Sequence, residues 1–184
     1  MSITTDLMTL EQYAAHEDGD ERYLTELVRG VLVREPRPGG THGSLQVLLG
    51  RFLSEWARPR GARVTAESGY VLDENPPTLR GPDLAVVLDA RSGKGRIGGW
   101  IEGAPDVAVE ILSPSDRSSP IHEKTLDYLQ AGAREVWIVD PPARTVTVFR
   151  PDGTARVLRV DDTLDGGDVL AGFSLSLAEL FSDL

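Results

Sequence analysis

Six residues near the middle of the chain, Val107-Ala108-Val109-Glu110-Ile111-Leu112, decide the fold class. Five of the six are apolar, and Ser113-Pro114-Ser115 ends the run. A strand without polar alternation is expected where both faces of a sheet are covered, as in α/β folds. The stretch therefore predicts a central strand that is buried on both faces and carries one carboxylate.

Two further apolar runs flank this strand in the sequence, at residues 83–88 and 135–139. Residues 120–131 predict a helix between strands, with Pro120 in its first turn and Gly132 after its last. Because strands and helices alternate here, we expect an α/β domain with a central mixed sheet flanked by helices.

The N-terminal part predicts a short helix, a hairpin and one long helix. Thr9 and Gln12 fit a capping box at the beginning of the short helix. Residues 23–28 and 31–34 predict a hairpin around Arg29-Gly30. The long helix has its apolar residues in one stripe at helical spacing: Leu45, Leu48, Leu49, Phe52, Leu53 and Trp56.

Shorter elements are predicted in the remaining segments. Residues 64–71 predict one or two strands, and residues 91–99 a glycine-rich loop. Residues 145–149 and 155–160 predict a second hairpin, and residues 176–181 a closing helix. Hairpins near both ends indicate antiparallel edges, and 184 residues suit a single domain, residues 1–184.

Composition and charge exclude several classes of protein. The chain has 19 Lys and Arg against 29 Asp and Glu, a formal net charge of −10, which argues against a generally basic nucleic-acid binder. It has no cysteine, which excludes disulfide scaffolds, thiol catalysis and Cys-ligated metals. Residues 22–63 hold eight Arg and three Glu. Residues 1–21 and 161–184 each hold six Asp or Glu and no Lys or Arg. Either these acidic ends aid solubility, or the basic stretch faces a polyanion.

Targeting and membrane segments are not predicted. The first ten residues have neither a basic region nor an apolar core of the kind found in signal peptides. No apolar run approaches the length that spans a bilayer. We therefore expect a cytoplasmic protein without membrane contact.

Carboxylates in or beside apolar strands are the strongest indication of a functional site in the sequence. Asp83 follows Pro82 where one apolar strand begins, and Glu110 lies inside the next. Burying an unpaired carboxylate costs several kcal/mol, so Glu110 needs a cation, a positive partner or a proton. Either salt bridges to Arg satisfy these acids, or the two converge on a divalent metal, for which hard oxygen ligands suit Mg²⁺ or Mn²⁺.

The chain has two lysines among 19 basic residues. Lys94 lies in the glycine-rich segment, whereas Lys124 lies one turn into the helix that follows the Glu110 strand. A helix in this position packs back on the sheet, so Lys124 can orient a water or neutralise charge that develops on a phosphate. The alternative is a solvated helix residue. Tyr128, one turn later, is either a neighbour of the site or a core residue.

Five short motifs follow one another along the chain: Leu24-Thr25-Glu26-Leu27-Val28-Arg29-Gly30, Arg80-Gly81-Pro82-Asp83-Leu84, Val109-Glu110-Ile111-Leu112-Ser113-Pro114-Ser115, Lys124 with Tyr128, and Glu135-Val136-Trp137-Ile138-Val139-Asp140-Pro141. In these motifs and their order, the chain resembles the Uma-two family, a bacterial group of endonucleases with the restriction-endonuclease-like, PD-(D/E)XK core. The resemblance covers roughly residues 8–180.

The resemblance implies an αβββαβ core, with extra hairpins at the edges, that binds Mg²⁺ and cleaves phosphodiester bonds. By position, Asp83 is the PD acid and Glu110 the (D/E) acid. Glu26 matches the acid that the N-terminal segment contributes, and the backbone carbonyl of Ile111 is a further metal ligand by analogy.

The chain departs from the plain pattern at one position. Leu112 stands where that pattern has lysine, and the resemblance gives this role to Lys124 on the following helix. His42 matches a histidine that is often seen in the family, with no role attached. Asp106, in a second Pro-Asp pair, is more simply a turn residue.

We therefore expect a Mg²⁺-dependent endonuclease that acts on DNA and forms a homodimer, because two sites suit the cutting of two strands. Asp83, Glu110 and Glu26 are its expected metal-binding and catalytic acids, with Lys124 orienting water or neutralising charge. Two alternatives stay open: a non-catalytic binding or assembly module of the same fold, and a Mg²⁺-dependent phosphohydrolase with a smaller substrate. Clustered carboxylates without metal also predict at least one raised pKa.

Overall fold

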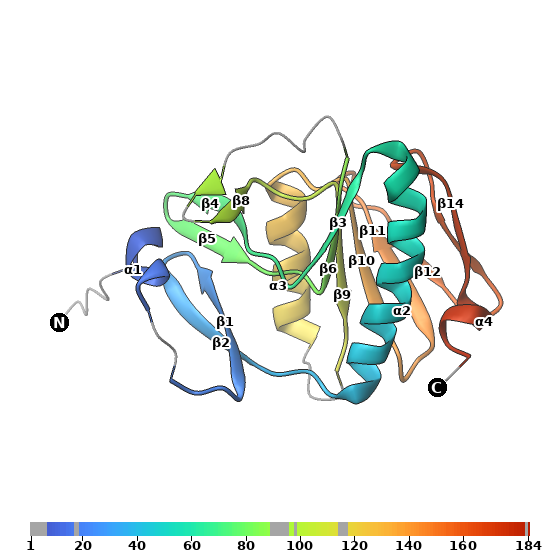
Figure 1. The fold of residues 1–184 in the computed structure, drawn as a ribbon, viewed down its shortest axis with the longest axis horizontal. Helices are drawn as coiled ribbons and strands as arrows, with labels where there is room; N and C mark the ends of the chain where they lie inside the picture. Colours follow the sequence, from blue (N-terminus) through green and yellow to red (C-terminus); the bar gives the residue numbers. More distant parts are fainter. Residues whose placement is uncertain (1–6, 17–18, 89–95, 98, 114–117, 183) are drawn as a thin grey trace.

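A six-stranded mixed sheet with the strand order β12-β11-β10-β9-β6-β3 forms the centre of the fold (Figure 1). The computed structural model describes residues 7–16, 19–88, 96–97, 99–113, 118–182 and 184. Strands β9 and β10 are parallel, and the other neighbouring pairs are antiparallel. The strands are β3 (Arg63–Ala66), β6 (Leu84–Val87), β9 (Val107–Ile111), β10 (Glu135–Asp140), β11 (Thr145–Phe149) and β12 (Ala155–Leu158).

Helices cover both faces of this sheet. Helix α2 (Gly40–Ala57) lies against one face and α3 (Ser118–Gln130) against the other (Figure 1). In chain order, α2, β3, β6, β9, α3 and β10 make up the αβββαβ core, with further strands inserted between β3 and β9. The predicted fold class, a central mixed sheet flanked by helices with hairpins at its edges, is confirmed.

The alternation of side chains along β9 explains why its sequence is apolar throughout. Val107, Val109 and Ile111 belong to the core under α2. Ala108 belongs to the separate core under α3, together with Tyr128 of that helix. Successive side chains of a strand point to opposite faces, so Glu110 emerges on the α3 face with Ala108. The fold thus places one acidic side chain between the sheet and α3.

A second six-stranded sheet, ordered β2-β1-β5-β4-β8-β7, packs beside α3 on the side away from α2 (Figure 1). Its core joins Leu27, Val71 and Leu79 to Leu10 of the short helix α1 (Leu10–Ala14). The predicted capping box of Thr9 and Gln12 is confirmed at α1. The strands are β1 (Tyr23–Val28), β2 (Val31–Pro36), β4 (Tyr70–Glu74), β5 (Pro77–Arg80), β7 (Arg96–Ile97) and β8 (Trp100–Glu102).

Two predictions in this region differ from the structure. The strand signal at 64–71 corresponds to β3 and β4, which belong to different sheets. The predicted loop at 91–99 is wrong at residues 96–97, which pair with β8; residues 91–95 and 98 lie outside the described residues. β5 was not predicted, because four residues beginning with Pro77 are too few to establish a period.

The C-terminal elements close the core on the α2 side. Strands β13 (Thr163–Gly166) and β14 (Leu170–Ser176) form a two-stranded sheet, and helix α4 (Leu177–Leu180) confirms the predicted closing helix. The single turn η1 (Arg58–Arg60) follows α2. The indole Nε1 of Trp56 donates to the Ala171 carbonyl at 3.1 Å. Within the described ranges, none of the helices has both the length and the apolar character of a membrane span.

Candidate active site

Asp83 and Glu110 meet where β6 and β9 lie side by side. The antiparallel register pairs Leu84 with Val109, so it brings Asp83 next to Glu110 one residue further on. The backbone N–H of Ile111 donates to Asp83 Oδ2 at 2.6 Å, which fixes the carboxylate against β9. The structure therefore brings together the two acids that the sequence placed on neighbouring strands.

Lys124 reaches the same place from α3. Its Nζ lies 2.8 Å from Glu35 Oε2, 3.3 Å from Glu26 Oε1 and 3.4 Å from Glu110 Oε2. The Lys124 side chain is 4% exposed. Tyr128, one turn further along α3, donates its hydroxyl to Glu110 Oε1 at 2.9 Å. Lys124 is thus an internal partner of three carboxylates rather than a solvated helix residue.

The crowding of charge changes the protonation of this cluster. Burial raises the pKa of Glu110 to about 8; Asp83, Glu26 and Glu35 add to the increase, and Lys124 opposes it. Burial lowers the pKa of Lys124, but Glu110, Glu26 and Glu35 outweigh that effect and raise it well above its usual value. The predicted raised pKa of a clustered carboxylate is therefore found at Glu110, whereas the ammonium group stays charged.

Glu26 faces donors of the protein on both oxygens. Arg80 Nη1 donates to Glu26 Oε2 at 2.8 Å, and the Gly81 N–H donates to Oε1 at 2.9 Å. Arg80 also donates to Asp127 Oδ2 on α3, from Nε at 3.1 Å and from Nη2 at 2.6 Å. All three charged side chains are buried. Glu26 therefore belongs to an ion network that joins β1, β5 and α3 behind Lys124.

Helix α2 supports Asp83 from the opposite side. The imidazole Nε2 of His42 lies 3.1 Å from Asp83 Oδ2, and the ring is 6% exposed. One turn later, the Gln46 amide donates to the Asp83 carbonyl at 2.8 Å. The histidine whose role the sequence left open thus contacts one of the two converging acids.

Asp106 occupies the other end of β9 from Ile111. Its Oδ2 accepts a hydrogen bond from the Leu88 N–H at 2.9 Å, and its carbonyl accepts from Arg134 and Glu135. These contacts join the beginning of β9 to the end of β6 and to the beginning of β10. They agree with the prediction of a turn residue outside the site.

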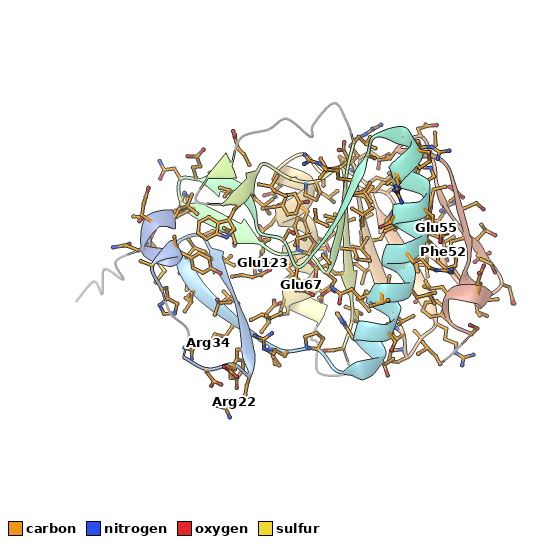
Figure 2. The ribbon with its side chains drawn as sticks, viewed as in Figure 1. Arg22, Arg34, Phe52, Glu55, Glu67 and Glu123 are labelled. Carbon is orange, nitrogen blue, oxygen red and sulfur yellow. The ribbon has the colours of Figure 1, made fainter. Side chains whose placement is uncertain are left out.

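A pocket of about 320 Å³ opens onto the converging residues. Asp83, Glu110, Ile111 and Lys124 are among the residues that line it. The β1–β2 hairpin forms another wall and includes Arg34, which Figure 2 labels near Arg22 at the end of this hairpin. A phosphate group that enters the pocket would meet both the acids and the ammonium group.

The oxygen ligands that line the pocket fit a small, hard cation. Both contacts of the Asp83 side chain within the described part of the chain use Oδ2, which leaves Oδ1 available. In the described part of the chain, no three or more His, Asp or Glu side chains are grouped so that they could hold a metal ion together. Mg²⁺ needs no such group, because it binds through one or two carboxylates and keeps several waters. Asp83 and Glu110 meet that requirement.

Sequence reasoning missed three charged residues of this cluster. Glu35 contacts Lys124, and Arg80 and Asp127 hold Glu26. Arg80 stands in a quoted motif, but nothing local to it indicates burial. Glu35 shares a face of β2 with Val33, and both are half-buried, but the sequence of the strand does not indicate which residue Glu35 contacts.

Comparisons with known proteins find a matching family model and a similar solved structure. A family model, Uma2, described as "Putative restriction endonuclease", matches residues 10–178. Among solved structures, a crystal structure of a "putative nuclease belonging to DUF820" from Anabaena variabilis ATCC 29413 is similar to this chain. It has 26% sequence identity and a TM-score of 0.83, and the alignment covers 95% of this chain and 98% of that one.

Two other comparisons add little. The DrdV–DNA complex has 17% identity and a TM-score of 0.43 over 77% of this chain and 11% of that one, a likeness too low to support an argument. The search of curated proteins gave no match. The family match across residues 10–178 nevertheless covers most of the chain, which therefore belongs to the Uma2 family and has the restriction-endonuclease-like fold.

Proposed function

We propose that this protein is an endonuclease that uses Mg²⁺ or Mn²⁺ to hydrolyse phosphodiester bonds in DNA. The observation that carries the proposal is the convergence of Asp83, Glu110 and Lys124 on one pocket. Membership of the Uma2 family supports the reaction class.

In this proposal, Asp83, Glu110 and the Ile111 carbonyl hold the cation. When bound, such a cation polarises a phosphoryl oxygen and lowers the pKa of a water ligand. Lys124 orients the attacking water or neutralises charge that develops on the phosphate. His42 and Tyr128 each hold one acid in place. Among the described residues, Glu110 lines the pocket whereas Glu26 does not, so we assign Glu26 to holding Lys124 and Arg80.

We infer that the basic hairpin beside the pocket contacts the DNA backbone. Arg22, Arg34 and Arg37 are exposed on or next to β1 and β2. Arg34 lines the pocket, and Figure 2 labels it near Arg22. Such contacts release counterions, so DNA affinity falls as salt rises. A homodimer would supply a second pocket for the second strand.

A plasmid-nicking assay tests the proposal. Purified protein is expected to convert supercoiled DNA to open-circle and linear forms with Mg²⁺ or Mn²⁺, and to do nothing with excess EDTA. An Asp83→Asn preparation made in parallel should not cut, which excludes a contaminating nuclease. If the wild-type protein does not cut but binds Mg²⁺ by calorimetry, a smaller phosphate substrate is indicated. If the wild-type protein neither cuts DNA nor binds Mg²⁺, the non-catalytic binding module is favoured.

Metal affinity is expected to increase with pH. Glu110, whose pKa is about 8, must lose its proton before it can bind a cation. Between pH 6 and pH 8 the association constant for Mn²⁺ should therefore rise by roughly tenfold per pH unit and then level off. Calorimetry in buffers of different ionisation enthalpy should detect about one proton released per cation at pH 6.5. A flat affinity profile over this range would contradict the assignment of Glu110 as a ligand.

A further inference from the structure

The shortest ion pair of Lys124 runs to a carboxylate that lies outside every sequence motif. Glu35 Oε2 is 2.8 Å from Lys124 Nζ, whereas Glu26 and Glu110 are 3.3 and 3.4 Å away. The Glu35 side chain is 34% exposed, against 6% for each of the other two. Lys124 is therefore held most closely by the carboxylate nearest to solvent.

The register of the hairpin explains this contact. Strand β2 pairs with β1 so that Val33 lies opposite Glu26 and Glu35 lies opposite Leu24. Residues opposite each other, and residues two apart, share a face of the sheet, so Glu26 and Glu35 project from the same face of the hairpin. Both reach the Nζ of Lys124. The hairpin thus supplies two of the three carboxylates around the ammonium group.

These carboxylates differ in their other partners. Glu26 is also held by Arg80 and Gly81, and Glu110 by Tyr128. The hydrogen bond of the Glu35 side chain within the described ranges goes to Lys124. A cation bound at Asp83 and Glu110 would repel the nearby ammonium and weaken its contact with Glu110. Lys124 then depends on the hairpin for its position.

We propose that Glu35 is a positioning residue, which holds the Lys124 ammonium group at the hairpin side of the pocket when a cation occupies the acids. The proposal rests on the proposed function, since it gives Lys124 a task beside a cation. It also links the hairpin that faces the DNA to the group that acts on the phosphate. Movement of the hairpin on binding of DNA would move Lys124.

The contact can be measured without any assay of activity. The chain has two lysines, Lys94 and Lys124, so ¹⁵N-lysine labelling gives two side-chain signals, and Lys94→Arg assigns them. Glu35→Gln should shift or broaden the Lys124 ammonium signal, most strongly with Ca²⁺ present as a cation that does not support cleavage. The matched control is Glu123→Gln, which removes the same charge beside Lys124 in the chain; Glu123 pairs with Arg29 and is half exposed. An unchanged Lys124 signal in Glu35→Gln would overturn the contact.

Cleavage kinetics then test the role. Under single-turnover conditions with Mg²⁺, Glu35→Gln should lower the cleavage rate constant by about 10- to 100-fold, the range found when a residue that orients a side chain of a metal site is lost. The affinity for DNA should not fall, because the substitution removes a negative charge from the pocket. Glu35→Asp should recover part of the rate, and Glu123→Gln should match wild type. A Glu35→Gln protein as fast as wild type would contradict the positioning role. If wild type itself does not cut, the nuclease proposal fails while the lysine signals still decide the contact.

Discussion

Replacement of Glu110 by glutamine is expected to abolish DNA cleavage and leave the protein folded. The amide keeps the size of the side chain but removes the charge that would hold the cation. Loss of metal stabilisation of the transition state is worth several kcal/mol, which corresponds to a fall in the rate constant of at least about 10³-fold. Single-turnover cleavage of a labelled duplex measures this. Residual cleavage within about tenfold of wild type would remove Glu110 from the metal site.

The same substitution should change the pH dependence of stability. Glu110 has a pKa of about 8 in the folded protein, against an ordinary glutamate pKa of 4.5 in the unfolded chain. Between these values the folded state keeps a proton that the unfolded state releases, so this group's contribution to stability falls as pH rises. Glutamine resembles the neutral acid at every pH. The metal-free variant should therefore lose less stability than wild type between pH 5 and pH 8, as measured by urea unfolding.

Together, the cleavage rate and the stability of Glu110→Gln distinguish a role in the active site from a role in packing. A residue needed only for packing would lower activity and stability together. Glu110→Gln should instead lose activity while metal-free stability is preserved or increases at pH 8. Parallel loss of both would indicate that the Glu110 charge is structural, as a partner of Lys124 and Tyr128.

Much of the fold was predictable because its central strands are apolar on both faces. The run at 107–112 predicted burial between two layers, and the structure places Val109 under α2 and Ala108 under α3. The stripe of the long helix likewise predicted the core face of α2: Leu45, Leu49 and Leu53 are buried. Periodicity of this kind is local, so the sequence alone could reveal it.

The site was only partly predictable, because contacts between distant elements leave no local pattern. Asp83 and Glu110 could be paired from neighbouring strands, and Lys124 from the helix that follows. The partners of Lys124 on β1 and β2 depend instead on how a second sheet packs against α3. Glu35 lies 89 positions from Lys124 in the chain, and no spacing rule connects them. The contacts of Arg80 and Asp127 could not be predicted for the same reason.

Replacement of Arg80 by methionine is expected to destabilise the protein by about 3–5 kcal/mol. Arg80 is 3% exposed and neutralises two buried carboxylates, Glu26 and Asp127. Methionine fills much of the volume but leaves both acids without their shared cation, and an uncompensated buried charge is costly. Urea unfolding at pH 7 measures the loss, and Arg29→Met provides the control. Arg29 also pairs with Asp127, at 2.8 Å, but is half exposed, so its removal should cost at most about 1 kcal/mol.

The source of this loss can be tested by removing the stranded charges as well. The triple variant Arg80→Met, Glu26→Gln and Asp127→Asn should recover part of the stability, because neutral amides cost less to bury than carboxylates. Recovery would assign the loss to charge rather than to packing. Cleavage should not return with stability in this variant, since Glu26 also contacts Lys124 at 3.3 Å. If cleavage did return, the ion network would serve only to hold β1, β5 and α3 together, and Lys124 would need no support from Glu26.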